Sequence, residues 1–366
     1  MPILAASLWA APRPKLVVVI SVDQMSAQLL EAYGPELKGG LARLRSEGTY
    51  FTEAYHDHGI TETGPGHSVL LSGRFPAHTG IVENRWVERS TGQRVYCVED
   101  AAAPNLNAPD RPGASNARLL GDELGDWLQA QVPGSRVFAV SGKDRAAILM
   151  AGRRPTGVYW FSAPTGFTTS TAYAKALPGW LQTLDQELGR RLTQDSWLWT
   201  KDPATPEGRV AQWTFGDVTV KNGALPRWIQ GLGMPMDKGF EFRFRTSPFL
   251  DAVTFEAAEA LLEAEHLGRG PATDLLALSF SSTDYIGHQY GMLGTEMRDQ
   301  IHRLDAGLGR FLDGLKRQHP DAWVVLSADH GGSDIAEVLA EQGLPARRIA
   351  SKPFLAALQE HLRGAF

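Results

Sequence analysis

Short hydrophobic runs that end in polar residues recur along the chain. Leu16–Val22 is a continuous, β-branched run that is followed directly by Asp23. Runs of this kind are typical of strands that are buried on both faces of a parallel sheet. Three further stretches share the pattern: Val137–Ser141, Leu275–Phe280 and Trp323–Ser327. Because open α/β sheets bind ligands at the carboxyl ends of their strands, we expect the polar residues after these four strands to lie together.

Helical stretches and one change of composition complete the predicted architecture. Four stretches have helical character, namely residues 37–47, 67–71, 249–267 and 296–315. Residues 155–248 instead combine tryptophans with glycine, proline and threonine, which predicts an inserted cap packed by its aromatic side chains. The chain is therefore predicted to be an α/β protein, a three-layer α/β/α sandwich with a mainly parallel central sheet. Its expected divisions are a start at 1–14, core segments at 15–154 and 249–366, and the cap at 155–248.

Composition narrows the classes of function and of metal site. With 366 residues and 43% hydrophobic content, the chain can bury a sizeable core. A formal net charge of -5 indicates no basic face, so nucleic acid is not expected as a partner. Cys97 is the one cysteine, which excludes an internal disulfide framework and a cysteine-rich zinc site. Any bound metal therefore needs histidine and carboxylate ligands.

The first eleven residues are apolar and small, as in the tail of a secretory signal, but they carry no basic n-region. A trimmed signal remnant and a disordered start are both compatible with this stretch. It is too short to span a membrane, and no other stretch of the chain has the length and hydrophobicity for a span.

Two candidate groups lie in the first part of the chain. Asp23 follows the first strand, where a carboxylate can bind a cation or cap a helix. Thr63 lies in the segment Thr61-Glu62-Thr63-Gly64-Pro65-Gly66-His67, at the start of a helix whose backbone N–H groups could receive phosphate oxygens. Its hydroxyl could be a nucleophile if a metal or base activates it, or simply a helix cap. Asn84 could donate to an anion or close a turn.

Cations and metal-ligand types follow the other three strands. Lys143 and Arg145 suit a phosphoryl group with several free oxygens, although a solvated basic loop has the same pattern. Asp284 and His288 are four residues apart and could bind one ion if a turn follows the strand. The neighbouring residues Asp329 and His330 follow the last strand and could serve adjacent ions.

In this order along the chain, these residues resemble the active-site set of the alkaline phosphatase superfamily. The chain looks most like the bacterial alkaline phosphatases with a threonine nucleophile, which are related to type I phosphodiesterases and nucleotide pyrophosphatases. The likeness runs from about Lys15 to Gly332, and the ordered set is far more specific than any single member of it.

The resemblance implies two zinc ions and a covalent intermediate. One zinc would be bound by Asp23, Thr63, Asp329 and His330, and the other by Asp284 and His288. Thr63 would become transiently phosphorylated, and water would then release inorganic phosphate. Asn84, Lys143 and Arg145 would bind the non-bridging oxygens, and the lysine–arginine pair favours a monoester because its dianion offers three free oxygens.

The resemblance also implies small-molecule phosphate monoesters as substrates and a periplasmic or secreted location; we favour a monomer.

One departure from the family pattern affects the second zinc site. The family completes that site with a histidine well downstream of the Asp329–Gly332 segment, whereas this chain ends at Phe366. His302, His56 or water could take that position, and His361 lies in an amphipathic helix where a packing role is expected. A phosphodiesterase or nucleotide pyrophosphatase, and a truncated inactive protein that binds metal or phosphate, remain alternatives.

Overall fold

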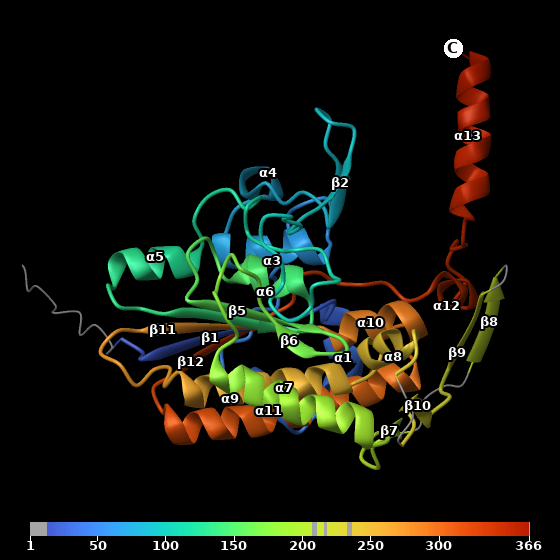
Figure 1. Cartoon of the computed structure of the whole chain (residues 1–366). Coiled ribbons are helices and arrows are strands. Elements are labelled where there is room, and N and C mark those ends of the chain that lie inside the picture. The colour runs from blue at the N-terminus through green and yellow to red at the C-terminus, as the bar shows by residue number, and fades with distance from the viewer. Residues whose placement is uncertain (1–12, 207–210, 216–217, 233–235, 366) are drawn as a thin grey trace, which may run out of the picture.

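A six-stranded sheet organises the chain (Figure 1). The structure, a computed structural model, describes residues 13–206, 211–215, 218–232 and 236–365. The stretch from Met1 to Ala11, read above as a signal remnant or disordered start, lies outside the described residues. The strand order is β12-β1-β11-β4-β5-β6, and every neighbouring pair is parallel except β5 with β6. The strands are β1 (Leu16–Val22), β4 (Val137–Ser141), β5 (Gly157–Ser162), β6 (Gly166–Thr168), β11 (Asp274–Phe280) and β12 (Trp323–Ser327).

All four strands expected from the hydrophobic runs are present, and they are the four adjacent strands at one side of the sheet. The expected burial on both faces holds for β1, β4 and β11 but is wrong for β12, an edge strand whose Trp323 and Val325 are 58% and 51% exposed. The side chains of these strands alternate between two apolar layers. In β1, Ile20 packs into the larger hydrophobic cluster and Val19 into the smaller cluster on the opposite face. This alternation follows from the two-residue period of a strand, and it explains why the run is apolar at every position but Ser21.

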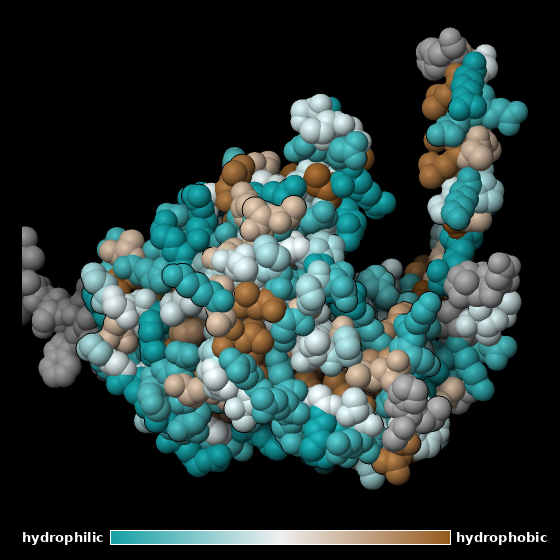
Figure 2. Space-filling model, viewed as in Figure 1, coloured by the Kyte–Doolittle hydropathy of each residue, from teal (hydrophilic) through white to brown (hydrophobic). Residues whose placement is uncertain are grey.

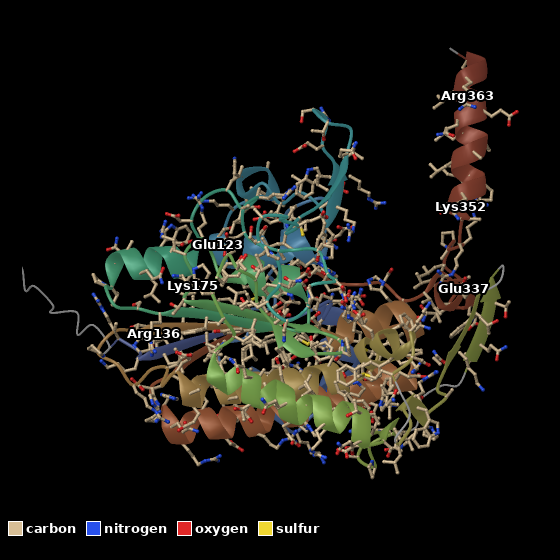
Figure 3. All side chains as sticks on the ribbon, in the orientation of Figure 1. Glu123, Arg136, Lys175, Glu337, Lys352 and Arg363 are labelled. Atoms are coloured by element: carbon tan, nitrogen blue, oxygen red, sulfur yellow. The ribbon has the colours of Figure 1, made fainter. Side chains whose placement is uncertain are left out.

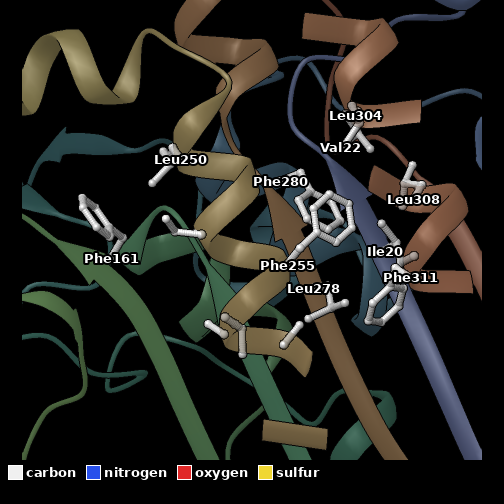
Figure 4. Close-up of a cluster of buried hydrophobic side chains, with 14 of the residues drawn as sticks. Ile20, Val22, Phe161, Leu250, Phe255, Leu278, Phe280, Leu304, Leu308 and Phe311 are labelled. Atoms are coloured by element: carbon white, nitrogen blue, oxygen red, sulfur yellow. The ribbon is translucent and has the colours of Figure 1, made fainter. Parts of the chain in front are cut away.

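Helices cover both faces of the sheet, which confirms the predicted three-layer sandwich (Figure 1). One face is covered by α3 (Thr63–Ser72), α5 (Leu124–Gln131) and α6 (Asp144–Met150). The other is covered by α2 (Gly40–Glu47), α7 (Gly179–Gln194), α9 (Phe249–Ala264) and α11 (Thr295–Gln318). Figure 4 shows the second layer, where Phe255 of α9 and Phe311 of α11 pack against Ile20 and Phe280 of the sheet.

The segment 155–248 does not form a single separate layer. Its first part supplies β5 and β6 to the central sheet, and α7 packs on α9 beneath that sheet. Two antiparallel pairs and one helix follow: β7 (Trp197–Trp199) with β10 (Arg227–Gln230), β8 (Ala211–Phe215) with β9 (Val218–Asn222), and α8 (Phe240–Arg245). The first part of the expected cap thus belongs to the core sheet, and the division of the chain into domains stays a prediction.

The C-terminal helix α13 (Ser351–Ala365) extends away from the body of the protein (Figure 1). Lys352 and Arg363 mark its two ends in Figure 3. Its apolar side chains are exposed and appear as brown patches in Figure 2; they are Phe354, Leu355, Leu358 and Leu362. No helix in the described part of the chain is long and apolar enough to cross a membrane.

The remaining elements lie around the sheet edge or on the surface. They are α1 (Ala27–Tyr33), the 3-10 helix η1 (Gly34–Glu36), α4 (Pro76–Thr79), β2 (Arg85–Val87), β3 (Arg94–Tyr96), α10 (Ser282–Tyr290) and α12 (Ala336–Glu341). Among the described strands, only β1 pairs with β12, whose Trp323 is 58% exposed. The sheet therefore has one sparsely covered outer edge.

Candidate active site

Strand register places two carboxylates level with each other at the carboxyl end of the sheet. Ser21 of β1 pairs with Ser327 of β12, so Asp23 and Asp329, each two residues further on, reach the same level. The backbone N–H of Asp23 donates to the carbonyl of Phe280 at 3.0 Å, which extends the pairing of β1 with β11 by one step. Both carboxylates are completely buried.

Helix α10 carries the next pair of predicted ligands. Asp284 and His288 are one turn apart, with 3.1 Å between Asp284 Oδ1 and His288 Nε2. The start of this helix is held by the buried Asp251, whose Oδ1 accepts the backbone N–H groups of Ser281 and Ser282, both at 2.9 Å. Asp251 thus satisfies donors that the first helical turn leaves without partners, and it sets the direction in which α10 leaves β11.

The predicted nucleophile is the first residue of α3. Thr63 is 2% exposed, and the helix starts there as expected, with Glu62 as the N-cap residue. A Cβ on Gly66 would lie 2.2 Å from the carbonyl oxygen of Asp329. Because only glycine allows that approach, α3 can pack directly against the backbone of the Asp329 segment.

Asn84 joins the start of the same helix. Its side-chain oxygen accepts the backbone N–H of Gly64 at 2.7 Å, and its own N–H donates to Glu62 Oε2 at 2.7 Å. With its oxygen engaged in this way, the Asn84 side chain keeps its NH₂ group as the donor for an anion beside Thr63.

The two predicted phosphoryl-binding cations reach Thr63. Lys143 Nζ and Arg145 Nη2 each lie 3.3 Å from its Oγ1. Lys143 also lies 2.6 Å from Asp23 Oδ2 and 2.5 Å from Asp284 Oδ2. Burial lowers the pKa of this ammonium group, but the two carboxylates raise it by more than burial lowers it. The group is therefore held in its charged form.

The ring of His330 is oriented so that Nε2 faces the carboxylates. Its Nδ1 lies 2.8 Å from the carbonyl oxygen of Gly331, and since a carbonyl can only accept, Nδ1 carries the proton. Nε2 then faces the carboxylates, 3.4 Å from Asp23 Oδ1 and 3.5 Å from Asp329 Oδ2. Burial lowers the pKa of His330, but these two carboxylates raise it to about 9, so Nε2 also carries a proton until a cation takes its place. Asp23 Oδ1 is buried and accepts no hydrogen bond from the described residues. A divalent cation fits this donor set, because it would satisfy that oxygen.

Ligand atoms of Asp23, Asp284 and His330 lie within 4.8 Å of one another, as do those of Asp23, His67 and Asp329. Burial would raise the pKa of Asp329, but His67, His330 and Lys143 lower it to about 2. Asp329 is therefore an anion at any neutral or mildly acidic pH, as a metal ligand must be.

His67 connects the nucleophile helix to Asp329. Its Nδ1 lies 2.8 Å from the carbonyl oxygen of Thr63 and 3.0 Å from Asp329 Oδ2, while Nε2 lies 2.8 Å from Ser279 Oγ. Nδ1 must carry the proton in this arrangement, so it donates to its neighbours. His67 thus holds the carboxylate of Asp329 against the start of α3.

The histidines considered for the remaining ligand position lie elsewhere. His302 Nε2 is 3.0 Å from Glu36 Oε2, and His56 Nε2 is 2.8 Å from the carbonyl oxygen of Ala328. His361 lies on the exposed helix α13. In the described part of the chain, none of these three belongs to a candidate metal group, and neither does His288; Asp284 groups with Asp23 and His330.

Three residues that sequence reasoning did not single out support the site. Glu62 holds Asn84, as described above. The hydroxyl of Tyr96 donates to Asp144 Oδ1 at 2.5 Å and accepts from Arg145 Nη1 at 3.3 Å. Gln24 donates its backbone N–H to Asp329 Oδ1 at 3.1 Å, and its Nε2 lies 3.2 Å from His288 Nε2. Tyr96 lies 47 positions before Lys143 in the printed sequence, and no spacing rule connects them.

The site opens into a cavity of about 480 Å³. Thr63, Asn84, Arg145, Asp284 and His330 are among the residues that line it. All residues predicted as catalytic or metal-binding therefore lie at one place at the carboxyl edge of the sheet, with Lys143 directly beneath Thr63.

Comparisons with known proteins point in one direction. A model of the type I phosphodiesterase / nucleotide pyrophosphatase family matches residues 17–353. Alkaline phosphatase PhoK from a Sphingomonas species is 40% identical over 337 residues, covering 91% of this chain and 58% of that protein. Alkaline phosphatase PhoD from Zymomonas mobilis is 37% identical over 343 residues, covering 91% and 57%.

The crystal structure of alkaline phosphatase PafA has the same fold, with a TM-score of 0.82 and 29% sequence identity. The match covers 97% of this chain and 70% of that chain. The chain thus spans less than two thirds of the length of the PhoK and PhoD proteins that it matches.

Proposed function

Because this chain belongs to the alkaline phosphatase superfamily, in the family of type I phosphodiesterases and nucleotide pyrophosphatases, we propose that it hydrolyses phosphate monoesters with Thr63 as the nucleophile. One observation carries the proposal. Thr63 Oγ1 lies 3.3 Å from two cationic groups, at the start of a helix and beside buried carboxylates. This arrangement combines a hydroxyl nucleophile with donors for the oxygens of the group it attacks.

The residues that would hold two divalent ions, zinc by resemblance, fall into two sets. By the same resemblance, Asp23, Thr63, Asp329 and His330 would hold one ion, and Asp284 with His288 the other. When bound, such ions lower the pKa of a hydroxyl ligand and neutralise the leaving oxygen. The unsatisfied Oδ1 of Asp23 and the orientation of the His330 ring support the first set most directly.

The reaction then proceeds in two displacements. Thr63 Oγ gives up its proton to solvent and forms a bond to phosphorus while the bond to the ester oxygen breaks, and the departing oxygen takes up a proton from solvent. A water molecule then attacks the phosphothreonine, the bond between phosphorus and Thr63 Oγ breaks, one proton of that water returns to Thr63 Oγ through solvent, and inorganic phosphate leaves. Asn84, Lys143 and Arg145 would bind the non-bridging oxygens in both steps.

A phosphodiesterase or nucleotide pyrophosphatase activity is the second candidate, because the matching family is described by those reactions. Arg145 favours the monoester, since its guanidinium offers charge-assisted donors to the free oxygens of a dianion. In a diester, an ester group replaces one of these oxygens. As parts of the same proposal, the substrate is a small molecule, nucleic acid is no partner, the chain is a monomer and its location is periplasmic or secreted.

Hydrolysis of para-nitrophenyl phosphate and of its bis-ester by zinc-loaded protein tests the proposal. The expected result is a preference for the monoester that is abolished in Thr63→Ala. Absence of turnover in folded, zinc-loaded protein would favour the inactive alternative, and a preference for the bis-ester would favour the diesterase.

A further inference from the structure

A second cavity of about 430 Å³ adjoins the candidate active site. The two cavities share Asn84 and Arg145 as lining residues. Beyond them, the second cavity is lined by three more arginines that come from separate parts of the chain, namely Arg85 at the start of β2, Arg111 in a loop and Arg245 at the end of α8. We call this space the arginine cavity.

Positive charge exceeds negative charge around the arginine cavity. Arg111 and Arg245 share one carboxylate, that of Glu241, with which both form ion pairs. Two arginines therefore have a single anion between them. The guanidinium of Arg85 lies over the ring of Tyr96 at 4.4 Å, a contact that brings no negative charge.

The carboxylates in the lining leave this balance positive. Asp144 and Glu99 are the lining acids, so together with Glu241 three carboxylates face four arginines. Lys143 also lines the cavity, but its charge is balanced by Asp23 and Asp284. An anion would therefore enter a region of net positive charge.

Unused donors point to the same conclusion. The Nε atoms of Arg145 and Arg245 are buried, and neither has a hydrogen-bond partner among the described residues. A buried N–H group without an acceptor destabilises a protein, and an oxyanion supplies such acceptors. The side chains around these donors include Tyr285, whose ring lies 4.7 Å from Lys143 Nζ and 5.8 Å from the Arg245 guanidinium carbon.

Arg145 separates the two cavities. Its Nη2 reaches Thr63, while its Nη1 reaches the hydroxyl of Tyr96, which lines the arginine cavity. One guanidinium group can thus contact a phosphoryl group at Thr63 on one edge and a second anion on the other.

We propose that the arginine cavity is a second oxyanion subsite, which binds a phosphate or carboxylate group beside the phosphoryl site. The oxyanion is either a second anionic group, remote from the phosphoryl group, on the same phosphate monoester, or free inorganic phosphate. In the first case the inference rests on the proposed function and narrows its substrate class to phosphate esters that carry another anionic group.

The test compares the full chain with the double variant Arg111→Gln/Arg245→Gln. Arg243→Gln is the matched control. Arg243 lies on α8, as Arg245 does, but it pairs with Asp237 and does not line the cavity. Thermal melts of all three proteins check that they are folded. The substrates are butyl phosphate and the same ester with a terminal carboxylate, and the measured quantity is kcat/KM on zinc-loaded protein.

If the substrate supplies the anion, the double variant loses about tenfold in kcat/KM for the carboxylate ester and stays within about twofold for butyl phosphate. Calorimetric titration of the metal-free proteins with inorganic phosphate is the second arm. If free phosphate is the ligand, its affinity falls about tenfold in the double variant and is unchanged in Arg243→Gln.

Equal effects on both esters, together with the same phosphate affinity in all three proteins, would overturn the subsite. If no protein hydrolyses either ester, the proposed function has failed, and the calorimetric arm alone decides the subsite. Retained phosphate binding that depends on Arg111 and Arg245 would then still support it.

Discussion

The ammonium nitrogen of Lys143 lies 2.6 Å from Oδ2 of Asp23, and both side chains are fully buried. The same nitrogen lies 2.5 Å from Asp284 Oδ2. Asp23 and Asp284 also belong to a candidate metal group with His330. The lysine and a divalent cation therefore compete for the same two carboxylate groups, so the protein without metal and the protein with metal neutralise these carboxylates in different ways.

Replacement of Lys143 by methionine separates these two roles. In Lys143→Met, the carboxylates lose their buried partner, and we expect the metal-free protein to lose about 3 kcal/mol of its free energy of unfolding. Zinc should bind the variant at least as tightly as the wild type, because the competing charge is gone. Urea denaturation in excess chelator and competitive zinc titration measure the two effects.

Lys175→Met is the control for this experiment, because Lys175 is exposed and labelled well away from α10 in Figure 3. Equal stability of Lys143→Met and wild type in chelator would contradict the interpretation of the lysine as a charge partner.

Thr63→Ala should lower monoester hydrolysis at least about a thousandfold, because no other hydroxyl in the described site lies at this position to accept the phosphoryl group. Thr63→Ser keeps the hydroxyl and should retain measurable activity. Acid quenching during turnover, followed by peptide mass spectrometry, should find a phosphoryl group on residue 63 in the wild type and in Thr63→Ser. A phosphoryl group on another residue would assign the nucleophile elsewhere.

Arg145→Ala should distinguish monoesters from diesters. We expect kcat/KM for para-nitrophenyl phosphate to fall about a hundredfold, since one preorganised donor for the dianion is lost. The rate for the bis-ester should fall much less. Arg153→Ala, an exposed change on the same side of the sheet, should leave both rates near those of wild type. A parallel fall for both substrates would argue against a role for Arg145 in choosing monoesters.

Asp251 is a positioning residue, because it contacts the start of α10 and none of the reacting groups. In Asp251→Ala the backbone N–H groups of Ser281 and Ser282 lose their acceptor, and the helix that carries Asp284 becomes less well held. We expect zinc affinity to fall about tenfold, in the range known for the loss of groups that orient metal ligands. Asp251→Asn retains an acceptor oxygen and should recover part of that affinity; equal affinity in all three proteins would exclude the positioning role.

Asp185 predicts a pH dependence of stability away from the site. Burial raises the pKa of Asp185 from 3.8 to about 7, although hydrogen bonds from Phe167 and Asn107 oppose the shift. Between these values the folded protein binds a proton that the unfolded chain has released, so the free energy of unfolding falls as pH rises. The fall is about 2 kcal/mol once solvent screening is included.

Asp185→Asn should flatten this dependence, because the side chain can no longer ionise while its oxygen can still accept from Phe167. Urea midpoints between pH 4 and pH 8 for the two proteins, measured in chelator, give the comparison. Curves of identical slope would show that Asp185 titrates near its ordinary pKa.

The strands and the ligand positions could be predicted from local pattern. Asp23 and Asp329 each follow an apolar run that is long enough for only one buried strand, and parallel pairing then brings their ends together. The resemblance grouped these residues further, because their order along the chain carries more information than any one of them.

Contacts between distant polar side chains could not be predicted in this way. Lys143 was expected to bind phosphoryl oxygens, yet in this structure it lies between two carboxylates, which depends on the register of β4 against β11. The role of Asp251 follows from the packing of α9 below α10, and sequence spacing carries no signal for it. The run Gly157–Ser162 is as apolar as the predicted strands, but its tryptophan and the surrounding composition led to its assignment to a cap.

The two strands that carry the site are held unequally in the sheet, and this should make the protein lose activity before it loses its fold. Asp23 follows β1, which is paired on both sides, whereas Asp329 and His330 follow β12, which has one partner among the described strands. A strand paired on one side opens locally at lower cost than one in the middle of a sheet. Mild heating should therefore release Asp329 and His330 while the rest of the sheet stays intact, so inactivation comes before the cooperative melting of the protein.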